Sequence, residues 1–107
     1  MSYPKLGRYR HCVNSMREKY KVSAVDFDVV LYLSEHSAVS RDELQKNVTK
    51  SRGTMSTSLD YLISKQFIRL VNEHRVGVRG MSATYSIAPK GRNMVADFYM
   101  KMFPNYL

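Results

Sequence analysis

The side chains of this sequence best suited to chemistry are hydroxyl and guanidinium groups that follow Ser51. Serine and threonine hydroxyls and an arginine guanidinium donate hydrogen bonds that suit nucleic-acid base edges and phosphate oxygens. Gly53 and Ser56 are small, so a helix that carries them could bring its backbone close to a duplex. The residues of this face that we expect to bind DNA are Ser51, Arg52, Gly53, Thr54, Ser56, Thr57 and Tyr61.

Two short helices joined by a tight turn must position this face. Ser40 and Glu43 stand in S-x-x-E spacing, which predicts a capping box for a helix over 41–47. Ser51 predicts the N-cap of a second helix over about 51–65. Its apolar residues recur at helical spacing and predict a buried stripe of Met55, Leu59, Leu62 and Ile63. The pattern indicates a helix-turn-helix. An ordinary capped surface helix is the alternative, because Ser, Thr and Gly are poor helix formers.

A pair of strands follows the second helix. Segments 67–72 and 83–87 are rich in apolar and β-branched residues, and Gly77 and Gly80 lie between them. The pattern predicts a β-hairpin, and a hairpin after a helix-turn-helix is a wing. Arg75 and Arg79 fall in its tip, where they could enter a narrow minor groove. The alternative is that these two arginines are simply solvated.

The stretch from about residue 23 to residue 91 resembles a winged helix of the MarR type. The residues that carry this resemblance are Glu43, Leu44, Ser51, Arg52, Thr54, Ser56, Asp60, Leu62, Lys65, Ile87, Lys90 and Gly91. It implies an α+β, mostly α, winged helix-turn-helix fold. It also implies a usually dimeric transcriptional regulator that binds pseudo-palindromic DNA and often responds to a small ligand or oxidant. Gln66 stands where the family usually has a helix-ending glycine, which predicts a left-handed backbone there.

The charge of the chain favours a polyanionic partner. Seventeen lysines and arginines against nine acids give a net charge of +8. Double-stranded DNA is the first expectation and an acidic membrane surface the second. We expect Lys46, Lys50 and Lys65 to hold phosphates. A single cysteine excludes an internal disulfide, and neither a membrane span nor a signal peptide is visible, so we expect a cytoplasmic protein that does not enter membranes.

The termini predict further helices around this unit within a single domain, 1–107. Ser23 and Asp26 form a capping box for a helix over 24–35, and Pro89 can start the last helix. We divide the domain into an N-terminal arm (1–22), a winged-helix core (23–88) and a C-terminal helix (89–107). The predicted order is four helices, two strands and one helix.

Both terminal helices carry apolar stripes. They could pack on the core of the same chain. Because the core looks complete without them, however, we expect a second copy to cover them through a two-fold axis. The predicted dimer interface is Tyr9, Val13, Met16, Tyr20, Met94, Val95, Phe98, Tyr99 and Met102.

Catalytic and metal-binding patterns are absent from the sequence. His11, His36 and His74 are scattered without ligand spacing, so we expect no enzyme, no metal and no cofactor. Cys12 beside His11 could be a redox sensor, but its place on an apolar face favours a buried structural thiol.

The sequence therefore predicts a dimeric, sequence-selective DNA-binding regulator. One alternative is a winged helix for replication or genome packaging with little sequence selectivity. The other is a protein-interaction module that binds an acidic partner.

Overall fold

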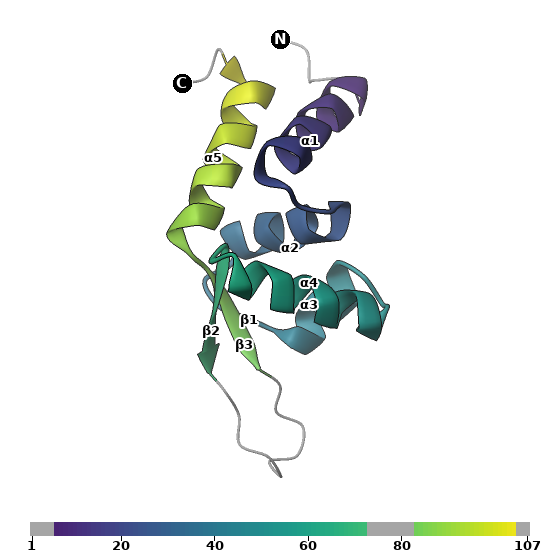
Figure 1. The fold of residues 1–107 in the computed structure, drawn as a ribbon, viewed down its shortest axis with the longest axis vertical. Coiled ribbons are helices and arrows are strands. Elements are labelled where there is room, and N and C mark those ends of the chain that lie inside the picture. The colour runs from purple at the N-terminus through teal and green to yellow at the C-terminus, as the bar shows by residue number, and fades with distance from the viewer. Residues whose placement is uncertain (1–5, 73–82, 105–107) are drawn as a thin grey trace.

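The computed structural model describes residues 6–72 and 83–104, which form a mostly helical fold with a small antiparallel sheet (Figure 1). Helices α1 and α5 lie side by side at one end of the molecule, with α2 next to them, and α3 and α4 lie beside the sheet. The described elements, in chain order, are α1 (Leu6–Tyr20), α2 (Ala24–Ser34), β1 (Val39–Ser40), α3 (Arg41–Asn47), α4 (Arg52–Ser64), β2 (Ile68–Asn72), β3 (Thr84–Ile87) and α5 (Pro89–Met102).

The sheet has the order β1-β3-β2, with β3 in the centre. Val39 lies opposite Tyr85, and Ile68 lies opposite Ile87. Tyr85 and Ile87 both point into the core, as their alternation predicts. The predicted element order is wrong in one respect, because it omits β1. Two residues are too short for any alternation to be visible in the sequence.

The helix starts follow their predicted caps with one exception. The Ser23–Asp26 capping box is complete, and the Ser51 hydroxyl accepts from the Thr54 amide at 3.2 Å. The Ser40 hydroxyl likewise accepts from the Glu43 amide at 3.1 Å. The reciprocal bond of that box is not among the described hydrogen bonds, because the Glu43 carboxylate instead accepts from the Tyr32 hydroxyl at 2.7 Å. Glu43 thus ties α3 to α2 rather than capping its own helix.

Two non-glycine residues in the described part of the chain adopt the left-handed backbone. Gln66 has φ 67°, which confirms the prediction from the missing glycine. The Phe67 amide then donates to the Leu62 carbonyl at 2.9 Å, and the chain turns from α4 into β2. Lys21, at φ 58°, ends α1 in the same way, and nothing in its side chain predicted this. A non-glycine residue in this region costs about 1–2 kcal/mol, which the surrounding packing must offset.

One hydrophobic cluster joins the terminal helices to the winged-helix unit. Met16, Met94 and Phe98 are buried, and the Phe98 ring meets the Phe27 ring edge-on at 5.0 Å between centroids. The expectation that the core is complete without the terminal helices is therefore wrong. Sequence periodicity shows which face of a helix is apolar, but not which surface covers it.

Gly91 lets α5 approach the sheet closely. A Cβ at this position would collide with the Phe67 carbonyl oxygen and the Ile87 side chain. The Phe67 carbonyl already accepts from the Ala88 amide at 2.9 Å, so its position is fixed. Only glycine therefore fits where α5 leaves the sheet.

Candidate nucleic-acid interface

Helix α4 presents a polar face to solvent. Met55, Leu59 and Leu62 are buried as predicted, whereas Ile63 remains half-exposed. The opposite side of the first two turns exposes Arg52, Gly53, Thr54 and Thr57. These side chains have the donors and the small size that a major-groove helix requires.

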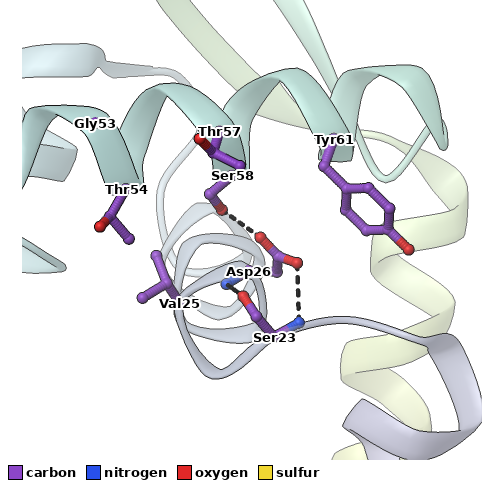
Figure 2. A pocket seen from close by; sticks show the side chains of 8 residues that line it. All are labelled: Ser23, Val25, Asp26, Gly53, Thr54, Thr57, Ser58 and Tyr61. Carbon is purple, nitrogen blue, oxygen red and sulfur yellow. Dashed lines mark hydrogen bonds between the residues drawn. The ribbon is translucent and has the colours of Figure 1, made fainter.

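A buried hydrogen-bond chain fixes the rotation of α4 about its own axis. The Ser58 hydroxyl donates to Asp26 Oδ1 at 2.6 Å, and the Ser23 amide donates to Asp26 Oδ2 at 2.9 Å. Asp26 and Ser58 are only 6% and 4% exposed (Figure 2). Asp26 thus caps α2 and anchors α4 with one carboxylate. The sequence revealed the cap, but the link to Ser58 depends on how the two helices cross.

An open cleft of about 600 Å³ separates the start of α2 from α4. Figure 2 shows Gly53, Thr54, Thr57 and Tyr61 along its α4 wall, facing Ser23 and Val25. The Tyr61 hydroxyl donates to the Lys21 carbonyl, in the link between α1 and α2. Tyr61 is therefore engaged within the chain, whereas Thr54 and Thr57 border open space.

Arg41 holds the start of α4 and was missed from the sequence. Its guanidinium donates to the Arg52 carbonyl at 3.3 Å, to the Ser56 hydroxyl, and to Gln45 Oε1 at 3.4 Å. Ser56, predicted to face DNA, is thus half-buried beside a guanidinium. Its place in the sequence could have indicated this role. Arg41 is the first residue of α3, directly after the Ser40 cap, and in a helix-turn-helix α3 must pack against α4.

The predicted phosphate-binding lysines do not form one cluster. Lys46 and Lys50 are exposed near the turn between α3 and α4, close in sequence to Ser51 and Arg52. Lys65 caps the other end of α4, a 13-residue helix of about 20 Å. Its ammonium lies 6.0 Å from the centre of the Tyr61 ring. Arg75 and Arg79 lie outside the described residues.

Most of the predicted dimer residues are used inside the chain. Met16, Met94, Val95, Phe98 and Met102 are buried where α1 and α5 pack together. Of the predicted set, Tyr9 and Tyr99 are exposed, at 36% and 40%, beside Met100 at 57%. A dimer that used the buried members would need the helix pair to open.

A polar latch also joins α1 to α5. Lys19 Nζ lies 2.6 Å from Asp97 Oδ2, and the Tyr20 hydroxyl donates to the same oxygen at 3.1 Å. The hydrogen bond from Lys19 lowers the pKa of Asp97, while burial raises the pKa of the Tyr20 hydroxyl.

Cys12 and the residue types that bind metals were the other candidates for chemistry in the sequence. Cys12 is buried, as a structural thiol should be. Among residues 6–72 and 83–104 no group of His, Cys, Asp or Glu could hold a metal ion. Within the same ranges no helix is both long and apolar enough to cross a membrane.

No protein-family model matches the sequence, and no curated protein matches it. Solved structures do share its fold. RV1404 from Mycobacterium tuberculosis superposes with a TM-score of 0.75 at 13% identity, over 94% of this chain and 65% of that chain. The apo form of wild-type MarR from E. coli gives a TM-score of 0.68 at 16% identity, over 94% and 78%. The chain has the MarR-type winged-helix fold.

A third structure with this fold contains DNA. The MepR-DNA complex from S. aureus gives a TM-score of 0.72 at 15% identity, over 86% of this chain and 73% of that chain. In the MarR-type fold of the present chain, α3 and α4 form the helix-turn-helix, and β2 and β3 form the base of the wing. Identities this low establish the fold alone. The chain also spans only about two-thirds of the length of RV1404.

Proposed function

We propose that this chain binds double-stranded DNA as a sequence-selective regulator of transcription, with α4 in the major groove. The observation that carries the proposal is the exposed face of Arg52, Thr54 and Thr57, held by Asp26 on one side and Arg41 on the other. A recognition helix needs this combination, because base contacts require side chains placed in a fixed orientation. MepR, which has the same fold, has been solved bound to DNA.

Positive charge supplies the affinity that does not depend on sequence. Lys46, Lys50 and Lys65 are exposed and can meet phosphates on either side of a groove filled by α4. The wing arginines, Arg75 and Arg79, would add electrostatic attraction in a flanking minor groove. Replacing both by Ala should flatten the slope of log affinity against log salt, by about 1 for each phosphate that the wing no longer neutralises. An unchanged slope would remove the wing from the interface.

A homodimer remains part of the proposal, on a revised surface. Tyr9, Tyr99 and Met100 are exposed at the end of the molecule built from α1 and α5. A two-fold axis beside them would bury three large side chains and place two recognition helices on one duplex. Sedimentation of the intact chain at micromolar concentration tests this, and a monomer of 12.4 kDa would exclude it.

Selection of bound fragments from a random DNA pool tests the function itself. A selective regulator should enrich one motif and bind it on the order of 10³-fold or more tightly than random DNA. Binding without enrichment would instead support a replication or packaging factor with little selectivity. Weak binding even at low salt would contradict both DNA functions.

A further inference from the structure

A second surface lies along the open edge of β2. A groove of about 580 Å³ is formed by the end of α4, the first residues of β2 and the start of α5. Its walls share no residue with the cleft between α2 and α4. Its lining is Ile63, Gln66, Ile68, Arg69, Leu70, Ala88, Pro89 and Lys90.

The strand that borders this groove has an unused edge. β2 pairs with β3 on one side, and no described strand lies on its other side. Leu70 and Val71 are 37% and 48% exposed, an unusual state for neighbouring apolar residues on a strand. An edge strand of this kind can pair with an extended segment of another protein, whose backbone supplies hydrogen bonds and whose alternate side chains fill pockets.

The charged side chains on the segments that line the groove are all basic. Segments 63–71 and 88–92 carry Lys65, Arg69, Lys90 and Arg92 and no carboxylate. The Arg69 side chain is exposed and makes no hydrogen bond or ion pair among the described residues, and Lys90 Nζ lies over the Phe67 ring at 4.6 Å from its centre. A second copy of this chain would bring like charges together. A DNA duplex has no side chains to fill the apolar floor.

We propose that this groove docks an extended, acidic segment of a partner protein. The segment's backbone adds to the free edge of β2, its apolar side chains lie against Leu70 and Ile63, and its carboxylates meet Arg69 and Lys90. Pairing of opposite charges sets which partner is accepted, while the apolar floor and backbone hydrogen bonds hold it. The proposal does not depend on DNA binding, because the groove and the face of Arg52 are lined by different residues.

Fluorescence anisotropy with two synthetic peptides tests it on the intact chain. One peptide alternates valine with glutamate, and its control alternates valine with glutamine. The acidic peptide should bind on the order of tenfold more tightly than the neutral one. Arg69→Glu with Lys90→Glu should abolish this preference. Arg10→Glu with Lys101→Glu, which makes the same change in net charge on exposed residues of α1 and α5, should preserve it.

Two controls keep the result interpretable. If the reversed-charge variant loses its far-UV circular dichroism signal, Arg69→Gln with Lys90→Gln replaces it, with the same expected loss of preference. Leu70→Thr should weaken the binding of both peptides while keeping the charge intact. This would separate docking in the groove from attraction to a basic surface.

Three outcomes would overturn the proposal. Equal affinity for both peptides would show no acidic preference, and equal losses in the two double variants would reduce the effect to net charge. The third outcome comes from a competition experiment, in which duplex DNA is added to the peptide complex. If DNA displaces the peptide, and if Arg69→Glu with Lys90→Glu lowers DNA affinity as much as it lowers peptide affinity, the groove is part of the DNA interface. A chain that fails to bind DNA can still bind the acidic peptide, so the two proposals can fail separately.

Discussion

Helix α4 and the α1–α5 pair differ in which side chains packing leaves free. The apolar stripes of α1 and α5 are buried against each other and against Phe27, so the apolar side chains of these two helices are mostly used inside the chain, apart from the exposed Tyr9, Tyr99 and Met100. In α4 the buried stripe is narrow, and two polar residues, Ser56 and Ser58, form hydrogen bonds with other helices. What remains free on α4 is therefore a small polar face around Arg52. Uncommitted side chains, rather than residue type alone, mark a binding surface.

The largest effect should come from the α1–α5 pair. Phe98→Ala should destabilise the chain by about 3–5 kcal/mol, because the ring is buried in the single chain. Urea unfolding at several protein concentrations checks this. The loss should be the same at each concentration. If the loss of stability grows as the protein is diluted, Phe98 lies in a dimer interface. Tyr99→Ala, at the exposed neighbour, should change stability far less.

The next effect concerns the bond that orients α4. Ser58→Ala should cost about 1–3 kcal/mol, because Asp26 Oδ1 loses its donor while buried. Thr57→Ala, on the exposed side of the same helix, should stay within about 0.5 kcal/mol. Urea midpoints of the two variants give the comparison. Equal midpoints would mean that the Asp26–Ser58 bond does not hold the helix.

The Arg41→Ala variant shows whether Arg41 positions the start of α4 or contacts DNA itself. Arg41→Ala should weaken binding to the selected DNA site by roughly 1 kcal/mol, because the Arg52 carbonyl and Ser56 lose their shared donor. Binding to random DNA and the salt slope should barely change. If the salt slope instead falls by about 1, Arg41 contacts a phosphate itself.

The smallest effect on stability should come from the polar contacts of Lys19 and Tyr20 with Asp97, between α1 and α5. Lys19 lowers the pKa of Asp97 in the folded chain, so the bond stabilises the fold above the unfolded pKa of about 3.9. This contribution is lost as pH falls through the lower folded pKa. Thermal melts from pH 6 to pH 2 should therefore show a slightly steeper loss for the native chain than for Asp97→Asn. Parallel curves would mean that solvent screens the pair completely.

The sequence predicted the elements better than the way they pack together. Caps at Ser23, Ser40 and Ser51, the buried face of α4 and the left-handed Gln66 all follow from local chemistry, and the structure confirms them. Local patterns did not reveal β1, the bond between Ser58 and Asp26, or the hydrogen bonds from Arg41 to α4. The hydrogen bonds join helices that meet across 11 to 32 residues of sequence, and β1 forms only because β3, much later in the chain, pairs with it.

Local sequence patterns also failed to predict how the terminal helices pack. Their apolar stripes were predicted correctly, but their packing against each other and against the winged-helix core was not. A helix period cannot distinguish a partner in the same chain from a second copy, because both bury the same face. The exposed Tyr9, Tyr99 and Met100 became visible as an alternative surface only after α1 and α5 had been placed together.

Whether α4 enters the major groove is tested most directly by Arg52→Ala on selected and random DNA at physiological salt. We expect a loss of about 1–3 kcal/mol on the selected site, relaxed preference at one base position, and much less change on random DNA. Thr57→Ala should relax a neighbouring position on the same helix face. Unchanged affinity and unchanged base preference in both variants would contradict a recognition role for α4, because a helix that reads bases through this face cannot lose both side chains without effect.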